Sequence, residues 1–295
     1  MKNILIIFIS LLLSTAANAD DKAKVLNKVS GKIGQTIASI IPGEGITETS
    51  LELRDDSDDS NFEFSILGVR DILSKENSNL FTQVSLHTQD INNDQRIVGN
   101  FGLGYRILTL NQSMMFGTNI FYDQDYTEGH NRLGFGLEGK AAMLDFSYNE
   151  YFKSTNQKIV NGIKEQVLSG YEYNISSQIP YMPWSKINYQ EYEWDNEKAK
   201  NNLEGSIYSI EMALTQSLDF NLEKDVSSVT GVDDKHNYEL VYVYPPRENK
   251  PTLLDGLVSN LAFEKKNMQN KLKEKVRRNN NLVVEIQGSV VFTSK

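Results

Sequence analysis

One stretch, residues 114–152, constrains the fold most strongly, because apolar side chains alternate there with polar or small ones on both sides of a turn at 125–130. Successive side chains of a strand point to opposite faces, so this stretch predicts a β-hairpin with one apolar face and one polar, glycine-rich face. The apolar face before the turn comprises Met114, Phe116, Thr118, Ile120 and Tyr122. A lipid-facing exterior around a polar lumen requires this pattern.

The same alternation extends in both directions and identifies candidate residues of a polar lumen wall. In 98–107, for example, Phe101, Leu103 and Tyr105 oppose Asn100 and Arg106. The candidate lumen-facing residues are Asn100, Arg106, Asn119, Asp123, Arg132 and Glu138. Arg106, Arg132 and Glu138 carry opposite charges on one face, and we expect them to pair across the lumen and stabilise it.

The N-terminus predicts export from the cytoplasm. Lys2 gives a basic start, residues 4–13 are almost entirely apolar, and Ala17 and Ala19 form a small-x-small cleavage site. Cleavage after Ala19 is therefore expected, with an uncleaved anchor as the alternative. The apolar run is shorter than the roughly 20 residues of a membrane-spanning helix.

Composition narrows the class of protein but does not decide it. The 295 residues include no cysteine, which excludes a disulfide scaffold and thiolate metal sites. The net charge of −9 disfavours nucleic-acid binding. The 14 tyrosines and 13 phenylalanines suit strands and the aromatic girdles of membrane barrels. A modest hydrophobic fraction fits both a porin-like barrel and a soluble exported β protein.

The pattern divides the chain into a signal peptide (1–19), a periplasmic helix and linker (20–45), a β-barrel (46–245) and a helical linker with a terminal strand (246–295). The expected strands are 50–54, 62–70, 80–89, 98–107, 114–123, 132–140, 142–152, 166–178, 186–194, 204–215, 218–224 and 237–244. An even count of about twelve is typical of a bacterial outer-membrane barrel. A β-sandwich shows the same alternation with its apolar face inward, but a run of hairpins behind a signal peptide favours the barrel.

Two segments predict helices. Apolar residues recur at helical spacing in 20–41, and again in 253–275, which leads into a basic stretch ending at Arg277 and Arg278. A basic helix after an acidic barrel would neutralise an acidic lumen. An ordinary solvated periplasmic helix remains the alternative.

Other motifs favour structural roles over chemistry. Gly134, Gly136 and Gly139 match a dinucleotide fingerprint formally, but they lie inside a predicted strand rather than at a helix start. The carboxylates Asp55, Asp56, Asp58 and Asp59 suit a solvated turn better than a calcium loop, since the glycine and distal glutamate of an EF-hand are missing. The Asp123 and Asp125 pair flanks a turn without a nucleophile, and the three histidines lack metal-ligand spacing. We therefore expect no cofactor, no metal and no enzymatic activity.

Several motifs together carry a resemblance to a known family. They are Asn-Leu-Phe-Thr-Gln at 79–83, Asn-Phe-Gly-Leu-Gly-Tyr-Arg at 100–106, Phe-Tyr-Asp at 121–123, Gly-His-Asn-Arg-Leu-Gly-Phe-Gly-Leu-Glu at 129–138 and Val-Arg-Arg-Asn-Asn-Asn-Leu-Val-Val-Glu at 276–285. In these motifs, their order and their approximate spacing, the chain resembles the translocator domain of inverse autotransporters, the intimin/invasin family, over most of residues 45–290. The tail signature is Arg278, Asn279, Asn280 and Asn281.

The resemblance implies a twelve-stranded barrel in the outer membrane of a Gram-negative bacterium. Such a barrel contacts outer-membrane lipid, is inserted by the barrel-assembly machinery, and carries a following segment through its pore to the cell surface. In the family, that segment leads into immunoglobulin-like adhesive domains. This sequence reaches Lys295 just after the expected terminal strand, so no passenger is expected within it. A stand-alone porin-like barrel and a soluble exported β protein are the alternatives, and the oligomeric state stays open.

Overall fold

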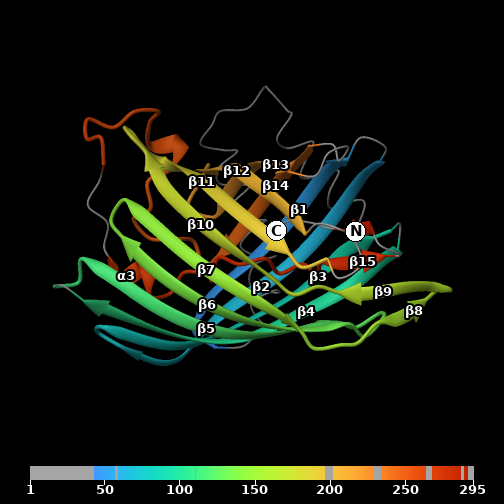
Figure 1. The fold of residues 1–295 in the computed structure, drawn as a ribbon. Helices are drawn as coiled ribbons and strands as arrows, with labels where there is room; N and C mark the ends of the chain where they lie inside the picture. The colour runs from blue at the N-terminus through green and yellow to red at the C-terminus, as the bar shows by residue number, and fades with distance from the viewer. Residues whose placement is uncertain are drawn as a thin grey trace.

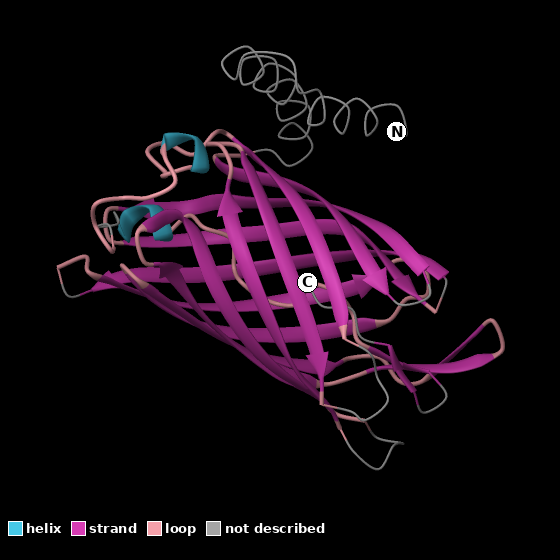
Figure 2. Cartoon of the chain, turned by 90° about the horizontal axis from the view of Figure 1, so that it is seen from above, coloured by secondary structure: helices cyan, strands magenta, loops and turns pink. Residues whose placement is uncertain are grey.

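A computed structural model describes residues 43–56, 59–92, 94–109, 111–196, 202–228, 234–263, 268–286 and 289–291. The predicted signal peptide, the predicted helix at 20–41 and Asp58 lie outside these residues. Within them the chain forms a closed antiparallel barrel of twelve tilted strands (Figures 1 and 2). The predicted all-β barrel with an even strand count is thus confirmed.

The barrel strands follow one another as an up-and-down meander, and the last one closes on the first through the pairing of β1 with β14. They are β1 (Gly45–Asp56), β2 (Asp59–Lys75), β3 (Ser78–Ile91), β4 (Asp94–Thr109), β5 (Met114–Asp125), β6 (Asn131–Ala141), β7 (Leu144–Lys153), β10 (Gly170–Ile179), β11 (Met182–Trp194), β12 (Leu203–Ala213), β13 (Leu218–Ser227) and β14 (Lys235–Tyr244).

The two faces of the wall follow the alternation of the sequence. On β4, the side chains of Phe101, Leu103 and Tyr105 are exposed on the outside, whereas Asn100 and Arg106 are buried on the inside. The same two-residue period continues through β5 and β6. Because closure removes the sheet edges, every strand finds two partners, and the apolar face is left to contact lipid.

The two ends of the barrel differ in the length of their connections. At one end, the turns 76–77, 110–113, 142–143, 180–181 and 214–217 join neighbouring strands. We call this the short-turn end. The opposite, long-loop end includes the connections 126–130, 154–169, 195–202 and 228–234. The first residue of β1, Gly45, and the last residue of β14, Tyr244, both lie at the short-turn end. The chain therefore enters and leaves the barrel wall at this end.

The strand predicted at 166–178 is wrong as a single element. Residues Ile163–Val167 form β9, which belongs to a second sheet with β8 (Lys158–Val160), β15 (Val284–Ile286) and β16 (Ser289–Val291). Residues Gly170–Ile179 form β10 of the barrel. The break falls at 168–169, where the N–H of Leu168 bonds the carbonyl of Val283 instead of a barrel strand.

The helix predicted at 253–275 is also wrong over the described residues. That region contains one 3-10 turn, η1 (Leu253–Asp255), and one helical turn, α3 (Met268–Lys271), both at the same end of the barrel (Figure 2). Among the described residues, no helix has the length and apolar character needed to cross a membrane.

Candidate functional site

The C-terminal residues 268–286, which we call the tail, lie inside the barrel and run from α3 to β15 (Figure 1). The tail runs alongside β3, and each of three β3 residues bonds the tail residue that lies 193 positions later in the sequence. Asn79 donates to the carbonyl of Leu272 at 3.2 Å, and Gln83 accepts the N–H of Val276 at 2.8 Å. Farther along, Gln89 makes two bonds to the backbone of Leu282, at 2.7 and 2.9 Å.

The constant offset requires an extended tail. A strand rises about 3.3 Å per residue, whereas an α-helix rises only about 1.5 Å. The ten steps from Leu272 to Leu282 span the same length as the ten steps from Asn79 to Gln89 of β3, so the tail advances at the rate of a strand. The wall supplies the backbone partners that a helix would otherwise provide, and this explains why the helical spacing of the sequence did not produce a helix.

Other wall residues also bond the tail through its backbone. Arg106 donates to the carbonyls of Leu272 and Glu274. Similar bonds run from Asn149 to the carbonyl of Arg277 at 2.9 Å, from Arg132 to that of Asn279 at 2.9 Å and from Asn100 to that of Asn280 at 3.0 Å. Buried peptide groups are costly when unpaired, so these contacts make an extended segment stable inside the barrel.

The centre of the lumen holds a buried ion network around Asp123. Its carboxylate lies 2.6 Å from Arg278 of the tail and 2.8 Å from Arg132 of β6. Asn100 donates a further bond to it at 2.8 Å. These four residues are each no more than 5% exposed, so the two guanidinium groups depend on one carboxylate for their neutralisation.

Each basic residue of the tail in this region meets a carboxylate of the wall. The pairs are Lys271 with Asp145 at 2.8 Å, Lys273 with Asp71 at 2.8 Å, Lys275 with Glu48 at 2.7 Å, Arg277 with Glu211, and Arg278 with Asp123 at 2.6 Å. The carboxylates come from five different strands. The basic stretch therefore neutralises acidic wall groups, although it does so as an extended chain.

Glycines of the wall make room for aromatic rings that support arginines. A Cβ atom on Gly102 would lie 2.3 Å from the ring of Phe121, so the ring lies flat against the backbone of β4. The guanidinium of Arg278 lies over the other side of that ring, 4.2 Å from its centroid. A second stack is formed by Gly104, Phe81 and Arg106.

This stacking gives a testable prediction. Gly102→Ala should lower the free energy of unfolding by about 1–3 kcal/mol, because the buried Phe121 ring cannot move away without displacing Arg278. Gly139→Ala is the matched control: its Cβ would meet only Phe116, at 3.9 Å, and we expect a change below about 0.5 kcal/mol. Urea unfolding in detergent, followed by heat-modifiable gel migration, measures both. Equal losses in the two variants would contradict the stacking account.

At the long-loop end, the tail pairs with β9 as an added strand. Val284, Glu285 and Ile286 of β15 oppose 165–167 of β9 in antiparallel register. Glu165 of β9 is held by a bidentate pair with Arg96, at 2.7 and 2.8 Å.

His130, in the turn before β6, lies 3.4 Å from Glu165. Burial lowers the pKa of His130 below its ordinary value, although Glu165 and Asp125 act in the opposite direction. The neutral imidazole therefore packs beneath the point where the tail leaves the barrel.

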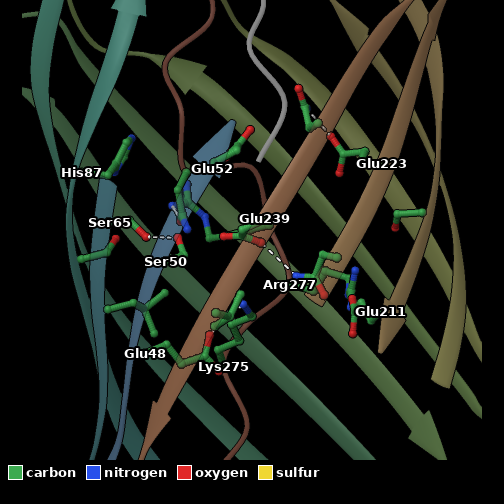
Figure 3. A pocket seen from close by; sticks show the side chains of 18 of the residues that line it. Glu48, Ser50, Glu52, Ser65, His87, Glu211, Glu223, Glu239, Lys275 and Arg277 are labelled. Carbon is green, nitrogen blue, oxygen red and sulfur yellow. Dashed lines mark hydrogen bonds and ion pairs between the residues drawn. The ribbon is translucent and has the colours of Figure 1, made fainter. Parts of the chain in front are cut away.

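A small cavity of about 120 Å³ remains beside the tail. Its wall is formed mainly by β1, β2 and β12–β14, and it reaches Arg278 of the central network (Figure 3). Glu48, Glu211 and Glu239 line it, together with Lys275 and Arg277 of the tail (Figure 3). The tail and the wall therefore line this cavity together.

The structure brings most of the candidate residues together. Asn100, Asp123 and Arg132 contact the tail signature, and Arg106 pairs with Glu138 at 2.9 Å across Gly117. The expected charge pairing is therefore seen for Arg106 with Glu138, whereas Arg132 pairs with Asp123. Asn119 lies beside Gly136 on the same wall.

Some contacting residues were not singled out from the sequence. They are Gln89, Asn149, Tyr151 and Glu172, whereas Asn79 and Gln83 entered only as the ends of the motif at 79–83. A signal did exist for Gln89, since it shares the polar face of one alternating strand with Asn79 and Gln83. Among the described residues, no group of His, Asp and Glu side chains is arranged to hold a metal ion.

The comparisons with known proteins match this arrangement. The model of the family "Inverse autotransporter, beta-domain" matches residues 10–280. The chain is 30% identical over 130 residues to an invasin of Yersinia enterocolitica, which covers 42% of this chain and 15% of the invasin. It is 25% identical to an intimin of Citrobacter freundii over 96% of this chain and 30% of the intimin. The chain thus spans less than a third of either relative.

A solved structure shares the fold. It comes from work on the in-meso crystallization of membrane proteins and covers 82% of this chain and all of its own, with a TM-score of 0.65 and 18% sequence identity. The closed barrel and the family match together place the protein among outer-membrane β-barrels. The chain belongs to the inverse autotransporter β-domain family.

Proposed function

We propose that this outer-membrane barrel is a translocator that carries its own C-terminal segment through the pore to the cell surface. The observation that carries the proposal is the extended tail, which follows β3 from residue 79 to residue 89 and is bonded to the wall along that whole length. A segment in transit must be extended and must have its peptide groups satisfied away from bulk water.

The direction of transport follows from the two ends of the barrel. Outer-membrane barrels have short periplasmic turns and longer extracellular loops, so the short-turn end faces the periplasm. β3 runs from the turn 76–77 at that end to the connection with β4 at the long-loop end. Because the tail is parallel to β3, it enters from the periplasm and leaves at the cell surface.

The proposal assigns roles to the segments of the chain. Residues 1–19 direct export and are removed after Ala19, residues 46–245 form the barrel, and residues 246–295 supply the linker through the pore. Insertion by the barrel-assembly machinery is part of this proposal, and membership of the family supports it. One relative, of Escherichia coli, is named an inverse autotransporter adhesin. Presentation of an adhesive segment beyond the tail is the corresponding role here.

A stand-alone porin-like barrel is the second candidate. The cavity of about 120 Å³ beside the tail is the observation in its favour. The charged groups that line this cavity, such as Glu48 and Glu211, also pair with the tail. Their pairing favours a cavity wall that holds the tail over one that conducts solutes.

An epitope placed after Lys295 tests the proposal. In intact cells, this epitope should bind antibody and be removed by external protease. The matched control carries the same epitope in the short turn 142–143, where it should become accessible only after the outer membrane is permeabilised. A Lys295 epitope that stays protected in intact cells, in a barrel with normal heat-modifiable migration, would overturn the threaded route.

A further inference from the structure

An apolar segment projects from the short-turn end of the barrel. It spans residues 251–263, between β14 and the tail, and we call it the strap. The side chains of Leu254, Leu257, Val258 and Leu261 are 61–68% exposed, which is more than the outward side chains of β4. Four large apolar side chains so close together and so exposed are unusual on a surface that faces water.

The strap carries only four polar side chains, those of Thr252, Asp255, Ser259 and Asn260. Its only charged residue is Asp255. That carboxylate accepts bonds from the N–H and the hydroxyl of Thr252, at 2.9 and 2.8 Å, and so caps η1. The N–H groups of Asp255 and Gly256 bond carbonyls within the same turn. Asp255 and Asn260 are themselves exposed, so the strap fits the boundary between water and acyl chains, where apolar side chains reach lipid and polar groups stay hydrated.

Hydrogen bonds fix the strap to the turn between β10 and β11. The N–H of Tyr181 bonds the carbonyl of Ala262 at 2.9 Å, and the N–H of Ser259 bonds the carbonyl of Tyr181 at 2.8 Å. The indole of Trp184 donates to the carbonyl of Leu257 at 3.1 Å. The strap is therefore continuous with the exposed wall of these strands, where Tyr181 and Ile187 are about half exposed.

We propose that the strap lies in the periplasmic leaflet of the outer membrane, with Leu254, Leu257, Val258 and Leu261 among phospholipid acyl chains. Tyr181 and Trp184 lie beside it, and amphipathic aromatic residues of this kind are enriched at the membrane–water boundary. The strap thus extends the lipid-facing surface beyond the strands and anchors the point where the chain turns from the barrel wall into the lumen.

Because the sequence contains no cysteine, a single cysteine introduced into the full chain can be labelled at one site only. A single nitroxide spin label on Val258→Cys is compared with labels on Ile120→Cys, which faces lipid on β5, and on Ile159→Cys in β8. The three native side chains are 68%, 56% and 72% exposed, so the sites are matched in exposure. The proteins are reconstituted in vesicles of phosphatidylethanolamine and phosphatidylglycerol, and collisions with oxygen and with a water-soluble nickel complex are measured.

The label at Val258 should resemble that at Ile120, with a several-fold higher ratio of oxygen to nickel collisions than the label at Ile159. A ratio equal to that at Ile159 would show a strap in water and overturn the proposal. A label shielded from both reagents would show a protein occupant, such as a second copy of this chain, and would overturn it equally. Leu254→Cys repeats the test if Val258→Cys does not show heat-modifiable folding.

Discussion

Asp123→Ala should lower the free energy of unfolding by about 3–5 kcal/mol, the usual cost of removing one partner from a buried ion pair. The substitution leaves Arg132 and Arg278 buried, close together and without the carboxylate that they share. It should also loosen the tail, because Arg278 is the tail's charged contact to this network, and Arg132 and Asn100, which bond the tail backbone, are held by the same carboxylate. Urea unfolding and limited proteolysis of the tail in the reconstituted protein measure the two effects.

Asp94→Ala is the matched control for this loss. Asp94 pairs with Arg96 at 3.6 Å, but its side chain is 38% exposed, and Arg96 keeps its bonds to Glu165. Exposed ion pairs contribute about 0–1 kcal/mol, so this variant should stay close to the parent protein. If Asp123→Ala unfolded at the same urea concentration as Asp94→Ala, the buried network would not be a principal source of stability.

Truncation after Phe263 should raise the single-channel conductance of the barrel in a planar bilayer by about an order of magnitude, because pore conductance depends on the open cross-section and its lining. The strap and all barrel strands remain in this variant. The tail that lies in the lumen is lost, and the wall carboxylates Glu48, Asp71 and Glu211 lose the basic tail residues that pair with them. The open pore should therefore also select for cations.

Truncation after Val291 is the control, since it keeps every tail contact from Met268 to Ile286. Its conductance should equal that of the full chain. A barrel truncated after Phe263 that migrates as a folded species and yet conducts no more than the full chain would show that the tail does not block the pore.

Much of the wall could be predicted from the sequence because alternation is a local property. Each strand must place lipid-facing and lumen-facing residues on opposite faces. The sequence of a single strand is therefore enough to assign Asn100, Asp123 or Arg132 to the lumen-facing side. The strand prediction failed at 166–178, and β8 was not predicted. At 167–170 the alternation is interrupted by two apolar residues followed by serine and glycine, and the bond of Leu168 to Val283 of the distant tail shows where β9 ends.

The tail could not be predicted in the same way, because its conformation depends on distant residues. Leu257, Leu261 and Leu272 have helical spacing, but isolated helical propensity is weak and tertiary contacts override it. In the structure, Leu257 and Leu261 belong to the exposed strap and Leu272 to the lumen. Nothing local in the sequence reveals that Asn79 and Gln83 provide the partners of residues 193 positions later.

The bonds between wall side chains and the tail backbone have a consequence for movement. Gln83, Gln89 and Asn149 contact peptide groups, which every residue carries whatever its side chain. An extended chain turns equivalent peptide groups to the same wall every two residues. Lys271, Lys273, Lys275 and Arg277 repeat with that same spacing. A shift of two residues would still offer peptide groups and basic residues to the wall, but it would put Asn280 in the place of Arg278. The pair of Arg278 with Asp123 therefore fixes the register of a chain that the other contacts alone would leave free to slide by two residues.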